Sequence, residues 1–261
     1  IKVSQLNIYP IKSLGGISVP AINITDRGFK YDRRWMLIDD NNNFLTQREF
    51  PVMALLKATI ATIGLRIFDM RDECDFFLVP SKPVTKQRVS TNIWGIPCMP
   101  FLVWDEADKW FSEKLQTNCR LVYMDDDTHV AINEQYNINK SLTSLSDGFP
   151  ILMISEASLD DLNSKASEQL PMNRFRPNIV LADVGPFDED RVIALRDGGI
   201  ELRAVKPCPR CPIPSIDQST AEHGPDPLDI LSRYRDDPAF GVVFGQNMIA
   251  VTGFGNAMRR G

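Results

Sequence analysis

Short apolar segments separated by turn residues occupy the region between residues 53 and 98, and they constrain the fold more than any other feature. We predict strands at Leu55–Ile63, Leu65–Phe68, Phe76–Val79, Val84–Val89 and Ile93–Cys98. A series of short strands of this kind is typical of a β-sandwich or a small barrel. The pattern therefore predicts a β-rich unit in the first half of the chain.

The remaining segments mix further strands with a few helices. Apolar residues at helical spacing predict helices at Ala107–Leu115, after Ser155 as the N-cap, and at Pro227–Arg235. Phe240–Phe244 and Met248–Val251 are predicted to be two strands joined by a short amide-bearing turn. The whole chain is therefore expected to be mainly β (α+β).

A chain of 261 residues can form one large or two small domains, with ample length for a hydrophobic core. The acidic and polar run Asp125–Lys140 is predicted to be a boundary or a surface loop. We accordingly predict an N-terminal unit at residues 1–125 and a second unit at residues 126–261.

Net charge, cysteine usage and hydropathy limit the partners. The formal net charge is −5, so no global attraction to a nucleic acid polymer or an anionic membrane is expected. No apolar run approaches the roughly 20 residues that span a bilayer. Five cysteines at irregular spacing, with no signal-like start, favour a reducing compartment. We therefore expect a cytoplasmic protein with no membrane or nucleic acid partner.

Two cysteines lie in a proline-rich stretch, Lys206-Pro207-Cys208-Pro209-Arg210-Cys211-Pro212, which follows the alternating segment Ile200–Val205. Prolines bias their neighbours towards extended conformations, so a stiff loop leaving a strand is predicted. An arginine beside a thiol lowers the pKa of that thiol because it favours the thiolate. The stretch therefore has the character of a binding site.

The spacing of the two cysteines does not by itself decide the chemistry of their thiols. They can be small buried apolar groups, zinc ligands, a redox dithiol, or a thiolate ligand of a softer or cofactor-bound metal such as molybdenum. A zinc site would lack two of its four ligands, because Cys74, Cys98 and Cys119 form no second pair at ligand spacing. A thioredoxin-like dithiol lacks the helix that should begin at its first cysteine.

Cationic and amide side chains stand where three predicted strands begin or end. Lys12 and Ser13 follow the first strand and precede two glycines, and Arg33 stands at the mouth of the next strand. Arg176 and Asn178 precede the apolar run at residues 179–182. These groups suit an anionic, hydrogen-bonding ligand, although solvated strand ends are an equally simple interpretation.

Six motifs in this order resemble the MOSC family, in which a molybdenum-cofactor-binding domain follows a β-rich N-terminal domain. The motifs are Pro10-Ile11-Lys12-Ser13, Asp32-Arg33-Arg34-Trp35, Ser155-Glu156-Ala157-Ser158-Leu159, Phe175-Arg176-Pro177-Asn178, Lys206-Pro207-Cys208-Pro209-Arg210-Cys211 and Phe244-Gly245-Gln246-Asn247. The resemblance implies a MOSC-type β-barrel core with flanking helices, preceded by a smaller β-rich N-terminal domain. It spans nearly the whole chain.

The resemblance also implies site residues and a cofactor. It implies a molybdopterin cofactor whose molybdenum is bound by the second cysteine of the Cys-x-Arg-Cys run, which is Cys211. The cofactor-binding residues that it implies are Lys12, Ser13, Arg33, Arg176, Asn178, Arg210, Cys211 and, from the last motif, Asn247.

The bacterial YcbX-type members of the family are similar to amidoxime-reducing components. That similarity implies a cytoplasmic bacterial reductase of N-hydroxylated compounds such as hydroxylaminopurines and amidoximes, with Cys211 as the catalytic residue. The alternative is a module that binds molybdopterin or carries sulfur on Cys211 without its own turnover. The prolines at Pro212 and Pro214 depart from the usual continuation of the motif, so the mouth of the site is expected to differ.

Electrons for such a reaction must come from a donor. YcbX-type proteins often continue into a ferredoxin domain whose 2Fe-2S cluster needs four cysteines. This chain ends at Gly261 before any such domain. We therefore expect the electron donor to be a flavoprotein or a ferredoxin-type protein or domain.

Overall fold

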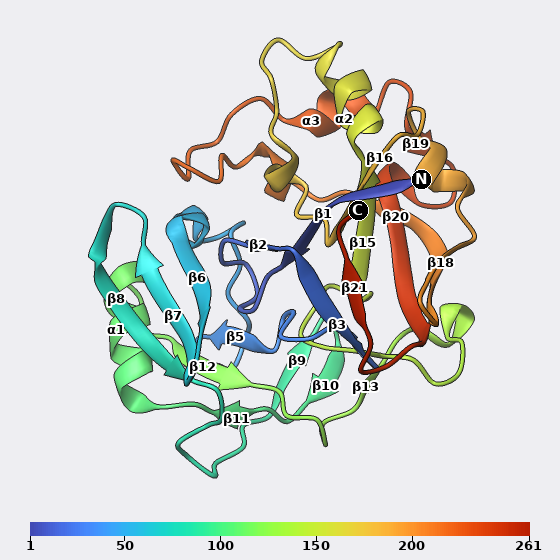
Figure 1. Cartoon of the computed structure of the whole chain (residues 1–261). Helices are drawn as coiled ribbons and strands as arrows, with labels where there is room; N and C mark the ends of the chain where they lie inside the picture. Colours follow the sequence, from blue (N-terminus) through green and yellow to red (C-terminus); the bar gives the residue numbers. More distant parts are fainter.

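One mixed sheet of eight strands forms the framework of the larger part of the molecule (Figure 1). The computed structural model describes residues 1–261. In spatial order the strands are β17 (Ala194–Asp197), β18 (Ile200–Pro209), β20 (Gly241–Thr252), β15 (Ile151–Ser155), β16 (Ile179–Ala182), β1 (Lys2–Ile8) and β2 (Ile17–Val19), and β19 (Asp236–Asp237) pairs with β20. All neighbours are antiparallel except β15 and β16, which are parallel.

The first strand of the chain completes the sheet of its second half. Leu6 of β1 lies opposite Ile179 of β16, and both belong to one buried apolar cluster with Met153, Leu202 and Met248. The two chain ends lie side by side, because the Gly261 N–H donates to the Val3 carbonyl (Figure 1). The division at residue 125 stays a prediction, and this sheet draws strands from both sides of it.

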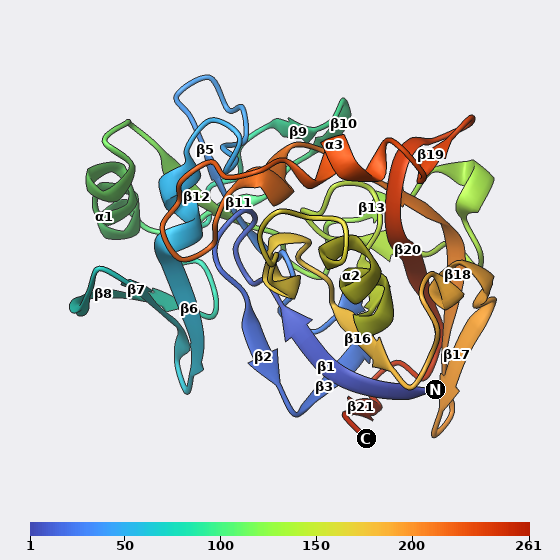
Figure 2. The ribbon, with the colours of Figure 1, turned by 90° about the horizontal axis from the view of Figure 1, so that it is seen from above.

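A second β-rich layer lies beside this sheet and has its own apolar core (Figure 2). It contains the meander β6 (Leu56–Ala61), β7 (Gly64–Asp69) and β8 (Asp72–Pro80), the sheet β11 (Phe101–Leu102), β12 (Arg120–Tyr123) and β5 (Trp35–Ile38), and the helix α1 (Asp105–Leu115). The predicted mainly β fold is confirmed.

Two strand predictions in this layer are wrong. Residues 84–89 form no strand, and only an isolated bridge joins Arg88 to Phe101. The segment Ile93–Cys98 is not one strand, because it contains the turn of a hairpin between β9 (Thr91–Ile93) and β10 (Ile96–Cys98). Trp94 and Gly95 occupy that turn with positive φ, which apolar alternation alone does not reveal.

The predicted helices form, and side-chain caps explain where two of them begin. The helix α2 (Glu156–Asn163) starts at Ser155, whose hydroxyl accepts from the Ser158 N–H at 3.1 Å. The helix α3 (Pro227–Leu231) starts at Asp226 in the same way and is shorter than predicted. Figure 1 shows α2 and α3 together at one end of the large sheet.

The remaining elements are short. The strands are β3 (Ala21–Thr25), β4 (Gly28–Phe29), β13 (Val130–Ala131), β14 (Leu142–Thr143) and β21 (Ala257–Arg259). The 3₁₀ helices are η1 (Pro51–Leu55), η2 (Glu134–Tyr136), η3 (Met172–Arg174), η4 (Asp188–Arg191) and η5 (Ile213–Ser215).

The long strands β18 and β20 differ from the prediction. β18 continues through the proline-rich stretch to Pro209, and the register with β20 shifts on both sides of Pro207. Prolines are tolerated in a sheet where such irregularities remove the need for a backbone donor. β20 is one strand and not two, because Gly245, with φ of 82°, kinks the strand without ending it.

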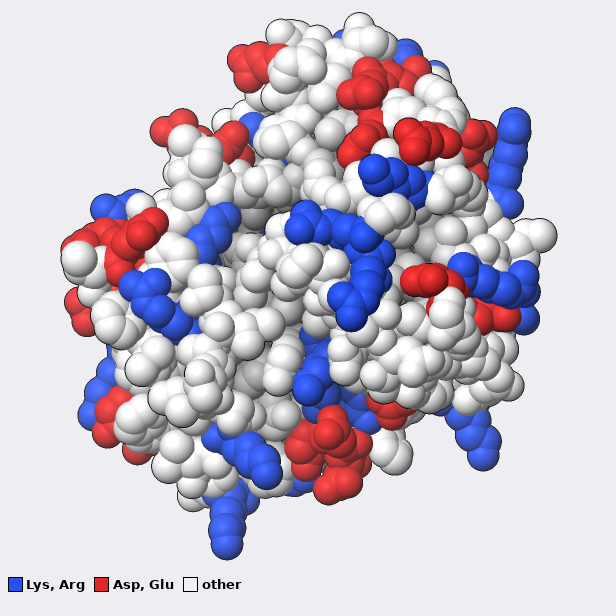
Figure 3. Space-filling view, viewed as in Figure 1, with Lys and Arg blue, Asp and Glu red and all other residues white.

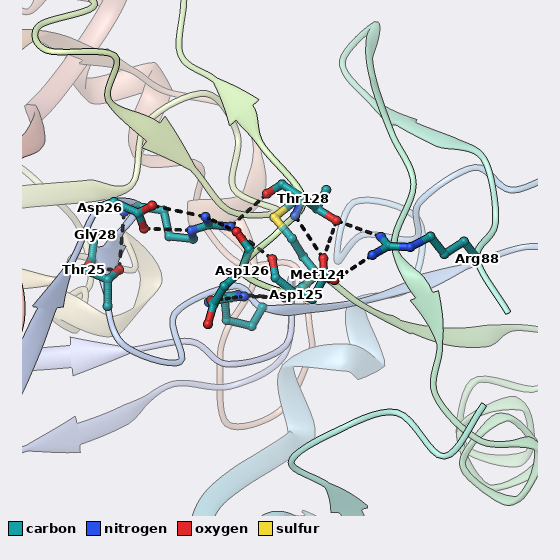
Figure 4. A network of polar contacts seen from close by, with 10 residues as sticks. Thr25, Asp26, Gly28, Arg88, Met124, Asp125, Asp126 and Thr128 are labelled. Atoms are coloured by element: carbon teal, nitrogen blue, oxygen red, sulfur yellow. Dashed lines mark hydrogen bonds and ion pairs between the residues drawn. The ribbon is translucent and has the colours of Figure 1, made fainter. Parts of the chain in front are cut away.

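Hydrogen bonds and an ion pair from three arginines hold the acidic loop that follows β12 in place (Figure 4). Arg27 donates to the carbonyls of Thr128 and Asp126, both at 2.9 Å. Arg34 donates to the Met124 carbonyl at 3.0 Å through Nε, and Arg88 pairs with Asp125 at 2.6 Å. The start of the predicted boundary run is therefore tied to three earlier segments of the chain.

Gly245→Ala is expected to lower the free energy of unfolding by about 2–4 kcal/mol. An added Cβ would lie 2.7 Å from the Met153 carbonyl oxygen and 2.6 Å from Ile154, and the backbone is in the left-handed region. Gly241→Ala on the same strand is the matched control, because its φ is 72° but nothing lies within 4 Å of the added Cβ. It should cost about 1 kcal/mol. Equal losses of the two variants in urea unfolding would contradict the proposed clash.

Candidate functional site

A cavity of about 360 Å³ lies between the end of β1, the start of β16 and the proline-rich end of β18. Six of its lining side chains are cations, namely Lys12, Arg33, Arg48, Arg176, Lys206 and Arg210, and Asp147 is its one lining carboxylate. Lys and Arg side chains gather near the centre of the face seen in Figure 3. A protein with a net charge of −5 thus has a strongly cationic cavity.

The structure brings together the site residues named from the sequence, with one exception. Those that line the cavity are Lys12, Ser13, Arg33, Arg176, Asn178, Arg210 and Cys211. Asn247 does not line it. Its amide donates to the Pro207 carbonyl at 3.3 Å, so it supports the backbone of β18 beside the cavity.

Asn178 uses its whole amide group within the protein. Its oxygen accepts from Arg33 and from the Leu152 N–H, both at 3.1 Å, and its nitrogen donates to the Asn7 carbonyl and to Asp32, also at 3.1 Å. An amide oxygen and nitrogen satisfied in this way leave little capacity for a ligand. Asn178 therefore orients Arg33 and connects β1, β15 and β16.

The carboxylate of Asp32 is the other partner of Arg33. It is buried, and it accepts from the Tyr9 N–H at 2.8 Å and from Arg33 Nη1 at 2.6 Å. Burial raises the pKa of Asp32, while the charge and hydrogen bond of Arg33 oppose that change. Asp32 thus holds the Arg33 guanidinium through Nη1, and Arg33 lines the cavity.

Tyr9 is a site residue that the sequence did not indicate. The guanidinium carbons of Arg33 and Arg176 lie 4.2 and 4.4 Å from the centre of its ring, although they are 143 residues apart in the chain. Its hydroxyl donates to the Pro177 carbonyl at 3.1 Å, and burial raises the pKa of Tyr9 to about 12. The neutral ring therefore positions two cations that would otherwise repel each other.

Three of the predicted site residues that line the cavity have a strained backbone. Ser13, Arg33 and Arg176 have φ values of 67°, 47° and 57°. Residues other than glycine adopt this region at an energetic cost and are found there most often at functional sites. Burial lowers the pKa of Arg176 to about 10, so this guanidinium still carries its charge at neutral pH.

Asp147 was not indicated by the sequence either. Its carboxylate pairs with the buried ammonium of Lys12, accepts from the Trp94 Nε1–H at 3.1 Å and lies 3.6 Å from Arg48. Lys12 also donates to the Leu145 carbonyl at 3.0 Å. Although burial acts to raise it, the pKa of Asp147 is held below its ordinary value by Lys12. One carboxylate thus neutralises part of the charge at this end of the cavity.

The two thiols differ in their surroundings. Cys208 accepts a hydrogen bond from Arg210 Nη1 at 3.3 Å, while Arg210 Nη2 donates to the Phe175 carbonyl at 3.0 Å. Cys211 lines the cavity, and no side-chain hydrogen bond occupies its sulfur. Both cysteines are partly exposed, so neither is a buried apolar filler. No group of three or more Cys, His, Asp and Glu side chains could hold a zinc ion.

Asp217 is the first acidic residue in the chain after Cys211. It does not line the cavity, and it pairs with Arg174 at 2.8 Å. Hydrogen bonds from Ser219 and Arg174 lower the pKa of Asp217 to about 2. An acid of that strength holds no proton at neutral pH. Asp217 therefore stabilises its own loop and is no proton donor to the cavity.

Comparisons with known proteins agree with this architecture. Residues 1–118 match the MOSC N-terminal beta barrel domain, and residues 141–255 match the MOSC domain. The chain is 32% identical to mitochondrial amidoxime-reducing component 1 of Mus musculus, over 94% of this chain and 74% of the mouse protein. It is 31% identical to mitochondrial amidoxime reducing component 2 of Bos taurus, over 95% of this chain and 79% of the bovine protein.

A more distant similarity is to molybdenum cofactor sulfurase of Drosophila grimshawi, at 27% identity over 88% of this chain and 30% of that protein. The fold and these similarities define a β-rich protein with a cationic cavity. The chain belongs to the MOSC family. No helix of the structure is long and apolar enough to cross a membrane.

The cavity has the donor set that a molybdopterin cofactor requires. The phosphate needs cations, the heterocycle needs hydrogen-bonding groups, and the metal needs a soft thiolate. Arg176 and Arg210 have no carboxylate partner, and the Nε of Arg210 is buried without any acceptor. An unsatisfied buried donor in a cationic cavity fits an absent anionic ligand.

Asp147→Asn is expected to lower the free energy of unfolding at pH 7 by about 1 kcal/mol, because it removes the charge that compensates the buried Lys12. The folded-state pKa of Asp147 lies below its ordinary 3.8. Its contribution is therefore present above that value and is lost as the pH falls through the folded-state pKa.

The difference between wild type and Asp147→Asn in urea unfolding should therefore be largest at pH 7 and 5 and smaller near pH 2. Arg48→Gln is the control, since it removes only the longer ion pair with the same carboxylate. A difference that does not shrink in acid would show that charge is not the cause.

Proposed function

We propose that this chain is a molybdenum-cofactor-dependent reductase of N-hydroxylated compounds such as amidoximes and hydroxylaminopurines. One observation carries the proposal: the half-exposed thiol of Cys211 lies in the same cavity as Lys12, Arg33 and Arg176, which come from distant parts of the chain. The similarity to amidoxime-reducing components supports the choice of reaction.

The proposed roles follow from the contacts. Arg33 and Arg176, oriented by Tyr9, bind the phosphate of the cofactor together with Lys12, and Ser13 contacts the pterin. Arg210 would bind the cofactor near the two thiols, and Cys211 would ligate molybdenum as a thiolate. Asn178 and Asn247 act indirectly. Asn178 accepts a hydrogen bond from Arg33 and orients it, and Asn247 donates to the Pro207 carbonyl and supports β18.

When bound, the cofactor supplies the two electrons that remove the N-hydroxyl oxygen as water. The chain orients the substrate beside Cys211 and keeps the surroundings cationic, which favours any negative charge that develops during N–O cleavage. No histidine lines the cavity, and Asp217 is ionised. We therefore propose that the protons come from solvent through the open mouth of the cavity.

Electrons would come from a separate flavoprotein or ferredoxin-type donor, or from a 2Fe-2S domain outside this chain. We further propose a bacterial cytoplasmic setting. The other candidate function is a module that binds molybdopterin or carries sulfur on Cys211, and the similarity to molybdenum cofactor sulfurases supports it. The two functions differ in what the protein holds after purification and in whether it turns over.

Anaerobically purified wild type should contain stoichiometric molybdenum and should reduce benzamidoxime with an artificial electron donor. Cys211→Ala should lose most of the metal and at least about a hundredfold in turnover, because it removes the proposed metal ligand. Cys208→Ala is the matched control. It deletes the thiol three positions earlier in the chain, on β18, whose contact is with Arg210, and it should retain molybdenum.

Bound molybdenum in wild type without any benzamidoxime reduction would refute the reductase assignment. A metal-free wild type carrying sulfide that Cys211→Ala loses would establish the sulfur-carrying alternative. Retention of molybdenum by Cys211→Ala, with loss in Cys208→Ala, would move the proposed ligand to the first cysteine.

A further inference from the structure

Lys206 lies on the cavity wall inside a cluster of three aromatic rings. Its ammonium nitrogen is 5.3 Å from the ring centre of Phe240, 5.4 Å from that of Tyr136 and 5.5 Å from that of Phe149. The rings come from separate segments, η2, the loop before β15 and the turn between β19 and β20. Such distances are typical of cation–π contacts, which hold an ammonium in place.

Lys206 is unlike the other cations of the cavity in having no acceptor. Lys12 and Arg48 pair with Asp147, and Arg33 pairs with Asp32. The remaining two, Arg176 and Arg210, donate to Gln218 and to the Phe175 carbonyl. Lys206 forms neither a side-chain hydrogen bond nor an ion pair, so its three N–H donors are free.

Lys206 has aromatic rings and not a carboxylate as its neighbours, and this difference affects its charge. An aromatic face attracts an ammonium through its quadrupole, but it neither neutralises the charge nor takes up its N–H groups as a carboxylate would. Lys206 is therefore held in position with its full positive charge. It stands two residues before Cys208 on β18, and both residues line the cavity.

We infer that Lys206 and its three rings form a substrate subsite that takes a carboxylate attached to a flat, N-hydroxylated substrate. The proposal rests on the proposed function for the N-hydroxyl end of the substrate. The carboxylate pairs with the Lys206 ammonium at the rim, and Phe149, which also lines the cavity, contacts the flat body of the substrate. A carboxylate matches one isolated ammonium, whereas a dianionic phosphate suits the arginines farther along the wall.

Equilibrium binding of benzamidoxime and 4-carboxybenzamidoxime, measured by calorimetry on the cofactor-containing protein as purified, tests this subsite. The two compounds differ only in the carboxylate. Wild type should bind the carboxylated compound about tenfold more tightly, the gain expected from one charge-assisted hydrogen bond. Lys206→Met, which keeps the aliphatic stem but removes the charge, should reduce this preference to about one.

Two further variants keep the test specific. Lys206→Arg retains the charge inside the rings and should keep most of the preference. Lys30→Met removes a lysine that lies 5.1 Å from the Tyr31 ring, outside the cavity, and should keep all of it. A preference that survives in Lys206→Met, or that is absent from wild type, would overturn the subsite. Failure of wild type to reduce benzamidoxime would refute the proposed function, while the binding ratio would still decide the role of Lys206.

Discussion

The cationic cavity depends on one buried carboxylate. Asp32 accepts hydrogen bonds from the Tyr9 backbone, the Asn178 amide and Arg33, which lie on three separate segments. Removing a carboxylate from water costs several kcal/mol unless its oxygens are paired. Two of the three partners, Arg33 and Asn178, also line the cavity. Satisfying this one group therefore joins β1 to β16 and fixes the direction of Arg33.

The acidic net charge of the chain did not predict the charge of its site. Carboxylates neutralise some of the cavity cations, but Arg176 and Lys206 have no carboxylate partner and lie against aromatic rings. Rings hold cations without cancelling them. The cavity thus keeps a positive potential in a protein of net charge −5, which is the condition that an anionic ligand requires.

Local pattern predicted local structure well where neighbouring residues decide it. The meander of β6, β7 and β8 and the helices α1 and α2 follow from alternation, helical spacing and the Ser155 cap. The predictions were wrong where pairing with a distant strand decides. β20 continues through Gly245, and β18 continues through Pro207. Both strands continue because their pairing with each other resumes after each register shift.

The sequence by itself determined which residue types could bind an anion and a soft metal, namely Lys12, Arg33, Arg176 and Cys211, because their chemistry belongs to the side chains. Only the tertiary structure decided that these residues share one cavity, since the pairing of β1 with β16 and of β18 with β20 brings them together. It also decided the parts of Tyr9, Asp147 and Lys206. Their roles consist of contacts with residues more than 20 positions away, which no local pattern of charge or hydrophobicity records.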